Sequence, residues 1–231
     1  MNIKLVSYSQ LPPDSTDFES SWKEDADLQE LVAYCARVSN PSNQLNSETS
    51  AKLIRFLIKN AHWSPLEMVS ACMEIETTRD IARQILRHRS FSFQEFSQRY
   101  ANPTNDLEFV TREARLQDSK NRQNSIELDD SETNKDLQEM WDRKQSDVIY
   151  AAQNSYKWAI ENGIAKEQAR AVLPEGNIMS RMYMNGTVRS WIHYIQLRSG
   201  NGTQKEHAEI ARACAEVIAN IFPISKEFIT G

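Results

Sequence analysis

A change of hydrophobic period, which occurs twice along the chain, constrains the fold more than any other feature. Apolar and polar residues alternate from Val69 to Glu76, which is the period-two pattern of a strand with one buried face. Helical spacing follows at once over residues 77–89. Alternation returns over residues 177–186 and leads directly into helical spacing over residues 187–200. This mixed order of strands and helices predicts an α+β fold with a mixed or antiparallel sheet.

Weaker patterns predict the remaining elements. A first strand is expected over residues 2–8, before the breaker formed by Pro12 and Pro13. Five further helices are expected over residues 27–38, 47–61, 135–161, 165–173 and 203–223. The longest of these helices is expected to bury one side, which is formed by Leu137, Trp141, Val148, Ala152 and Ser155.

Two helix ends carry sequence signals of their own. Asn162 and Gly163 follow the longest predicted helix and are typical of a C-cap, because glycine tolerates the left-handed conformation found there. Thr203 precedes Glu206 by three residues, which is the capping-box pattern of a helix start. We therefore expect the last helix to begin at Thr203.

One polar stretch interrupts this organisation. Residues 102–134 are rich in Asp, Asn, Ser and Lys and hold few apolar residues, so we expect an exposed or mobile insertion there. The rest of the chain shows no internal repeat and no domain boundary, and 231 residues are enough to bury a full core. We therefore expect a single domain over residues 1–231.

The composition excludes several classes of protein. The formal net charge is −5 and the pI is near 5.5, which argues against broad nucleic-acid binding. No apolar run is long enough to span a membrane, and the N-terminal stretch lacks the apolar core of a signal peptide, so a cytoplasmic location is expected. The three cysteines form no CxxC pair and the four histidines show no HExxH spacing, so we expect neither a disulfide framework nor a metal site.

A cluster of cations stands out against this acidic background. Residues 87–100, with the sequence RHRSFSFQEFSQRY, hold Arg87, His88, Arg89 and Arg99. Helical spacing places Gln84 and the first of these cations on one face, and the rest of the stretch is expected to form an ordered loop or turn. Guanidinium groups bind phosphate in a bidentate manner, so the cluster suits anionic ligands. A solvated helix end is the simpler alternative.

Three more arginines, Arg170, Arg189 and Arg198, lie in semi-apolar helical surroundings, and His193 shares a helix face with Arg189. Ion pairs with the many acidic residues would also explain each of them. The motifs of dinucleotide-binding folds, P-loops and hydrolase nucleophiles are missing from the sequence. The residues alone therefore indicate an arginine-rich pocket for phosphate-bearing small molecules, and they do not define a reaction.

The same stretch resembles the signature of the flavin-dependent thymidylate synthases, the ThyX family. That signature is Arg-His-Arg, seven residues, then Ser-x-Arg-Tyr, and here it reads Arg87-His88-Arg89, Ser97, Arg99-Tyr100. The flanking segments are similar to the family as well, and the resemblance covers nearly the whole chain outside residues 102–134. The similar segments are HWSPLEM, ARQILRHR, ARAVLP, VRSWIHYIQLR and TQKEHAEIA.

The resemblance implies an α+β homotetramer whose active sites lie between subunits. It implies that FAD, reduced by NADPH, serves the transfer of a one-carbon unit from 5,10-methylenetetrahydrofolate to dUMP. The products would be dTMP and tetrahydrofolate, and no cysteine nucleophile would be used. Neither nucleic acid nor a membrane would be a partner.

The resemblance also implies a set of site residues. Arg198 would be catalytic, because a guanidinium against the uracil ring stabilises the anion that forms there. The FAD ligands would be Ser64, Arg87, His88, Arg89, Glu95, Thr187, Arg189 and His193. The dUMP ligands would be Gln84, Arg87, Glu95, Ser97, Gln98, Arg99, Arg170 and Arg198.

The chain departs from the family pattern at a few positions. Gln94 and His193 stand where Asn is common in the family. A histidine at position 193 could titrate near neutral pH beside the flavin. The segment after Arg198 is longer than in some members, which leaves open whether Gln204 or His207 matches the family's polar residue there.

Three alternatives predict different behaviour. A flavin-free nucleotide-binding protein would keep the arginines but would show no visible absorbance. A nucleic-acid-binding module could stack bases on Phe91, Phe93 and Phe96 and would bind in a salt-dependent manner. A purely structural role predicts that Arg87→Ala would lower stability and leave activity unchanged.

Overall fold

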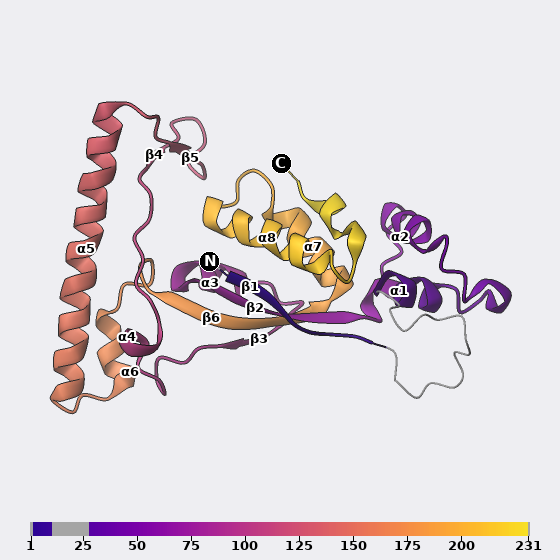
Figure 1. The fold of residues 1–231 in the computed structure, drawn as a ribbon, viewed down its shortest axis with the longest axis horizontal. Coiled ribbons are helices and arrows are strands. Elements are labelled where there is room, and N and C mark those ends of the chain that lie inside the picture. Colours follow the sequence, from indigo (N-terminus) through magenta and orange to yellow (C-terminus); the bar gives the residue numbers. More distant parts are fainter. Residues whose placement is uncertain (1, 11–27, 231) are drawn as a thin grey trace.

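A four-stranded antiparallel sheet forms the centre of the molecule. The computed structural model describes residues 2–10 and 28–230, so the predicted Pro12-Pro13 breaker lies outside the described residues. The strand order is β1-β2-β6-β3, and each neighbouring pair is antiparallel (Figure 1). The strands are β1 (Asn2–Tyr8), β2 (Ser70–Thr78), β6 (Met179–Thr187) and β3 (Ser92–Glu95).

Helices pack on one face of this sheet. The helices of the described residues are α1 (Leu28–Ala36), α2 (Ser50–Lys59), α3 (Arg79–Ile85), α4 (Pro103–Asp106), α5 (Glu132–Glu161), α6 (Lys166–Ala169), α7 (Val188–Arg198) and α8 (Lys205–Ile218). Short 3₁₀ turns cover Pro41–Asn43, Ser64–Glu67, Arg170–Val172 and Pro223–Phe228. In Figure 1, α7 and α8 lie above the sheet, and α5 stands apart at the end of the molecule opposite α1 and α2. The architecture is α+β, as predicted from the alternating periods.

The predicted alternation in β2 is confirmed and explains where the core lies. Ala71, Met73 and Ile75 are buried, while Glu74 and Glu76 lie on the opposite, wetter face. The buried residues join the inner sides of α3, α7 and α8 in one large apolar cluster. Burial of this apolar surface is the main stabilising contribution to such a fold.

The wetter face of the sheet carries cross-strand polar pairs. Glu74 lies opposite Tyr183 and Glu76 lies opposite Arg181. The Tyr183 hydroxyl donates to Glu74 at 2.9 Å, and Arg181 Nε donates to Glu76 at 2.8 Å. These pairs fix the register of two neighbouring strands from the face that the helices leave uncovered.

The first helix of the cation cluster is shorter than predicted. It ends at Ile85, and Arg87 and His88 lie in the turn that follows. Phe91 is buried against Trp191 and Tyr194 in the core, so the chain must reverse direction soon after the helix. The expected loop over residues 90–100 is also partly wrong, because β3 forms there and pairs with β6. A free edge of the sheet was available, and the local pattern did not show it.

The polar stretch 102–134 is largely exposed, as expected, but it has a defined structure. It contains α4, a hairpin of β4 (Arg115–Gln117) and β5 (Ser125–Glu127), and a β-bridge between Phe109 and Ile178. Arg112 and Arg115 of this stretch make ion pairs with Asp80 and Glu206 of the main body. Ion pairs and hydrogen bonds therefore dock the stretch, and hydrophobic periodicity could not reveal them.

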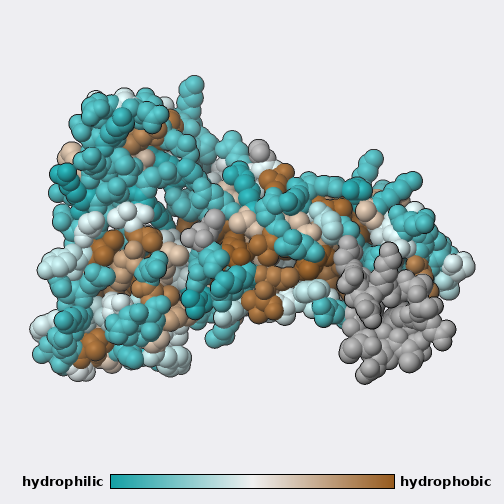
Figure 2. Space-filling view, viewed as in Figure 1, coloured by the Kyte–Doolittle hydropathy of each residue, from teal (hydrophilic) through white to brown (hydrophobic). Residues whose placement is uncertain are grey.

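The predicted inner side of α5 is wrong. Leu137, Trp141 and Val148 are 40%, 44% and 51% exposed, and of the predicted set Ala152 is the buried member. The side that packs inward holds Gln145, Ala152, Tyr156 and Ala159. Figure 2 shows apolar patches on the part of the surface where α5 and α6 lie. Most of the predicted apolar stripe is therefore partly exposed in the protomer, and Ala152 is its one member that packs into the interior.

Helix ends agree with prediction at one site and differ at another. Asn162 is the C-cap of α5 and Gly163 has a φ of 77°, so the predicted C-cap is confirmed. The predicted capping box is wrong, because Gln204 occupies the N-cap of α8 and Glu206 pairs with Arg115 instead. The Arg115 guanidinium offers the carboxylate a stronger partner than a backbone N–H. Over residues 2–10 and 28–230, no helix has the length and apolar content of a membrane span.

Candidate active site

The centre of the candidate site is a contact between Arg198 and His88. Arg198 is the last residue of α7, and His88 lies in the turn after α3. Arg198 Nε donates a hydrogen bond to His88 Nε2 at 2.9 Å. Because arginine only donates, His88 Nε2 must be an acceptor and the proton must sit on its Nδ1. The structure thus joins the predicted catalytic residue to a predicted FAD ligand.

A buried aromatic group supports this contact. The His88 ring meets the Tyr194 ring edge-on at a centroid distance of 4.9 Å, and the His207 ring lies 6.2 Å away. Burial and the Arg198 charge lower the pKa of His88 to about 4. Burial and the same charge lower the pKa of His207 to about 3. Both imidazoles are therefore neutral at neutral pH, which leaves Arg198 as the cation of this group.

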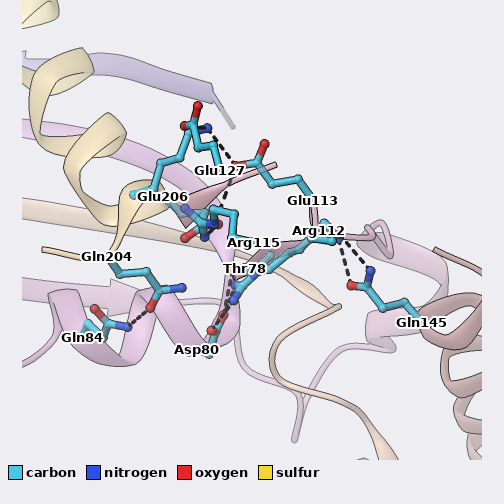
Figure 3. A network of polar contacts seen from close by, with 12 residues as sticks. Thr78, Asp80, Gln84, Arg112, Glu113, Arg115, Glu127, Gln145, Gln204 and Glu206 are labelled. Atoms are coloured by element: carbon cyan, nitrogen blue, oxygen red, sulfur yellow. Dashed lines mark hydrogen bonds and ion pairs between the residues drawn. The ribbon is translucent and has the colours of Figure 1, made fainter. Parts of the chain in front are cut away.

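Gln84 links this group to the start of α8 (Figure 3). Its Nε2 donates to Gln204 Oε1 at 2.8 Å, and its Oε1 lies 3.3 Å from His207 Nδ1. The sequence left open whether Gln204 or His207 belongs to the site. The structure brings both of them to Gln84, a predicted dUMP ligand, so the two residues work on the same side chain.

A second polar group surrounds Glu95. Its Oε2 accepts from Arg83 at 3.0 Å, and its Oε1 accepts from Ser180 at 2.8 Å and from Arg79 at 3.4 Å. Arg79 is buried and Arg83 is partly exposed. Sequence reasoning did not single out Arg79 and Arg83, although their i, i+4 spacing on one helix face was visible. Glu95 therefore holds Arg79 and Arg83 in place. This is compatible with the prediction that Glu95 contacts both FAD and dUMP.

The other predicted residues lie at separate places on the protomer. Arg189 and His193 share the exposed face of α7, and Arg189 pairs with Glu67 of the turn that also holds Ser64. Arg99 pairs with Glu167 of α6 at 3.0 Å, and Arg170 follows directly after α6. Thr187 accepts from the Ser190 backbone N–H as the N-cap of α7. Ser97 is half-buried and Gln98 is buried, with no hydrogen-bond partner for Gln98 Nε2 among the described residues.

Two cations of the signature remain uncompensated. Arg87 and Arg89 are exposed, and in the described part of the chain their guanidinium groups make no ion pair or hydrogen bond. Most other arginines near the site have a carboxylate partner. Two neighbouring uncompensated guanidinium groups suit an anionic ligand such as a phosphate.

A cavity of about 1000 Å³ lies between the β4–β5 hairpin and the start of α8, and Gln204 lines it. Three of its cations already have acidic partners, since Arg112 pairs with Asp80, Arg115 with Glu206, and Lys205 with two glutamates (Figure 3). None of the predicted ligands lines this cavity. The size of the cavity therefore does not make it the candidate active site.

Comparison with known proteins identifies the family. The profile of the family described as "Thymidylate synthase complementing protein" matches residues 22–224. The chain is 50% identical over 193 residues to a flavin-dependent thymidylate synthase from Synechocystis sp., covering 84% of this chain and 85% of that protein. The chain belongs to the flavin-dependent thymidylate synthase family.

A second relative agrees with this assignment, and a solved structure shares the fold. A probable flavin-dependent thymidylate synthase of Paramecium bursaria Chlorella virus 1 is 47% identical over 195 residues, which cover 84% of this chain and 87% of that protein. A crystal structure of the UMP/dUMP methylase PolB from Streptomyces cacaoi, bound with 5-Br dUMP, matches with a TM-score of 0.77. That match covers 98% of this chain and 93% of PolB at 22% identity, so it supports the fold.

Proposed function

We propose that this chain is an FAD-dependent thymidylate synthase. It converts dUMP into dTMP, takes the one-carbon unit from 5,10-methylenetetrahydrofolate, and uses NADPH as the reductant. The observation that carries this proposal is the contact of Arg198 with a neutral His88, inside a chain of this family. A charged guanidinium held by an uncharged, half-buried partner keeps its full charge available for a substrate anion.

The cationic residues present fit FAD. Arg87 and Arg89 are the uncompensated donors that a diphosphate requires, and Arg189 with His193 offers a second exposed polar face on α7. Ser64, His88, Glu95 and Thr187 complete the proposed FAD ligands. When bound, the flavin supplies the redox chemistry, and the protein contributes binding and orientation.

The proposed dUMP ligands divide into ring-side and phosphate-side groups. Arg198 and Gln84 belong to the buried polar group around His88, where a uracil ring would meet a guanidinium and an amide. Arg99 and Arg170 lie on the surface near Glu167 and suit the phosphate, as does the arginine of the signature, Arg87. Glu95, Ser97 and Gln98 connect the two regions along the chain.

The cysteines support a reaction without a thiolate nucleophile. Cys214 is fully buried, and burial raises its pKa. Burial also raises the pKa of Cys35 and of Cys72. A thiol with a raised pKa is mainly protonated at neutral pH and is a weak nucleophile. The uracil ring is therefore activated by Arg198 rather than by attack of a thiolate.

We also propose a homotetramer with active sites between subunits. The apolar stripe of α5, with Trp141 and Val148, is exposed in the protomer and suits a subunit interface. The proposed FAD and dUMP ligands are spread over separate places of one protomer, which a second subunit could bring together. The net charge of −5 supports small-molecule substrates over nucleic acid, and three unpaired cysteines suit the reducing cytoplasm.

The visible spectrum of the purified protein tests the proposal. We expect a flavin spectrum that bleaches on addition of NADPH, and faster bleaching when dUMP is present. Arg198→Ala should keep the flavin and lose dTMP formation, whereas Arg181→Ala on the far face of the sheet should retain activity. If the protein stays colourless when FAD is supplied, the proposal is wrong, and the arginines are better explained by a flavin-free nucleotide-binding protein.

A further inference from the structure

The Gln84 side chain is held at both ends by the start of α8. Its Nε2 donates to Gln204 Oε1 at 2.8 Å, and its Oε1 faces His207 Nδ1 at 3.3 Å. Gln204 is the N-cap of α8 and His207 lies in the first turn of that helix, so both partners sit on one rigid element. Two fixed partners of opposite character give the Gln84 amide one preferred orientation.

This arrangement also fixes the tautomer of His207. Gln84 Oε1 can only accept, so His207 Nδ1 carries the proton and His207 Nε2 carries a lone pair. The ring is fully buried and burial lowers its pKa to about 3, so the ring is neutral at neutral pH. His207 is therefore a neutral donor whose one N–H points at Gln84.

Stability alone does not account for a histidine at this position. His207 Nε2 is buried and has no hydrogen-bond partner among the described residues, and the same holds for the neighbouring Tyr194 hydroxyl. A buried polar atom without a partner costs free energy, which an apolar side chain would avoid. What the histidine provides, and an apolar residue cannot, is the N–H that meets Gln84.

We propose that His207 is a positioning residue for nucleotide recognition, which fixes the Gln84 amide so that Gln84 presents an N–H to an oxygen atom of dUMP. This inference rests on the proposed function, since dUMP is its ligand. Gln84 Nε2 has two hydrogens, and Gln204 takes one of them. Gln84 Oε1 already accepts from His207, and the second N–H is the one donor of the Gln84 amide left for the nucleotide. If the Gln84 amide were flipped, its N–H would face the His207 N–H and its carbonyl oxygen would face the Gln204 oxygen. Both contacts would then be repulsive, which disfavours the flipped orientation.

Two substitutions at position 207 separate positioning from packing. His207→Leu removes the donor to Gln84, and we expect dUMP to bind about five- to tenfold more weakly, the usual effect of losing one hydrogen bond. His207→Asn keeps an N–H near the position of Nδ1 and should bind dUMP within about twofold of the wild type. Cys214→Ala, which changes a buried side chain further along α8 and leaves Gln84 and its partners intact, is the control and should leave dUMP binding unchanged.

Binding is measured by titration calorimetry on the FAD-loaded protein, with dUMP, dCMP and deoxyuridine as ligands. If the Gln84 N–H meets the uracil O4, His207→Leu narrows the preference for dUMP over dCMP, which has an amino group there. If it meets the phosphate, His207→Leu narrows the preference for dUMP over deoxyuridine. Either result supports the proposal. Unchanged preferences and unchanged dUMP affinity in His207→Leu overturn it.

A spectroscopic readout keeps this test independent of catalysis. In protein labelled with ¹⁵N-histidine, His207 should show the Nδ1–H tautomer without any ligand, and an Nε2–H tautomer would overturn the proposal. FAD content should stay the same in all three variants. If the wild-type protein binds neither FAD nor dUMP, the proposed function is wrong. The tautomer of His207 would still show whether His207 donates to Gln84, so the two failures can be distinguished.

Discussion

Acid should destabilise this protein through the buried His207 and the half-buried His88, and His207 should carry the larger share. The unfolded chain has a histidine pKa of about 6.5, whereas in the folded protein burial and Arg198 lower the pKa of His207 to about 3 and that of His88 to about 4. The unfolded state therefore binds more protons below pH 6.5. The stabilisation is present above that pH and is lost as the pH falls toward the folded values.

The magnitude follows from these pKa values. Between pH 7 and pH 5 a group shifted from 6.5 to about 3 loses about 2 kcal/mol of unfolding free energy. The contribution of His88 to the unfolding free energy would fall by a similar amount if His88 were fully buried. Its partial exposure reduces this loss to about 1 kcal/mol. The wild type should therefore lose about 3 kcal/mol between these two pH values.

Urea denaturation at pH 7 and pH 5, at one fixed protein concentration, measures this loss. His207→Asn should lose only about 1 kcal/mol over the same range, because the residual effect belongs to His88. His62→Asn removes an exposed histidine and is the matched control, with the wild-type loss expected. Equal losses in His207→Asn and the wild type would refute the reasoning, since burial of His207 would then carry no penalty.

Three further predictions concern other parts of the molecule. Glu95→Ala leaves the buried Arg79 short of a carboxylate and should lower the unfolding free energy by about 3 kcal/mol in urea denaturation, more than Glu227→Ala at an exposed pair. Val148→Glu on the exposed stripe of α5 should yield smaller assemblies in analytical ultracentrifugation, and an unchanged mass would argue against this interface. Gly186→Ala places a Cβ about 2.4 Å from the Phe91 ring and should lower the melting temperature, whereas Gly176→Ala, in open space, should not.

The fold class follows from sequence because strand and helix periods are local properties. The alternation in β2 and β6 and the helical spacing of α7 all correspond to elements in the structure. The C-cap at Gly163 was predictable for the same reason, since a left-handed residue after a helix favours glycine. The organisation of residues 1–231 as a single domain stays a prediction.

Features that depend on distant partners could not be predicted in this way. The capping box at Thr203 failed because Arg115, which lies 91 residues before Glu206 in the chain, pairs with Glu206. The apolar stripe of α5 was visible in the sequence, but whether it faces the protomer's own core or another subunit depends on where the helix docks. β3 forms because the edge of β6 is free, and no local pattern encodes that edge.

The sequence by itself determined the family, since the spacing from Arg87 to Tyr100 is a linear property of the chain. It also determined which residues carry charge. Only the tertiary structure decided which charges remain available, because Arg79 and Arg83 are held by Glu95, while Arg87 and Arg89 have no acidic partner among the described residues. The physical reason is that an ion pair or a hydrogen bond needs two groups in one place. Folding sets that distance, as the contact of Arg198 with His88 across 110 residues shows.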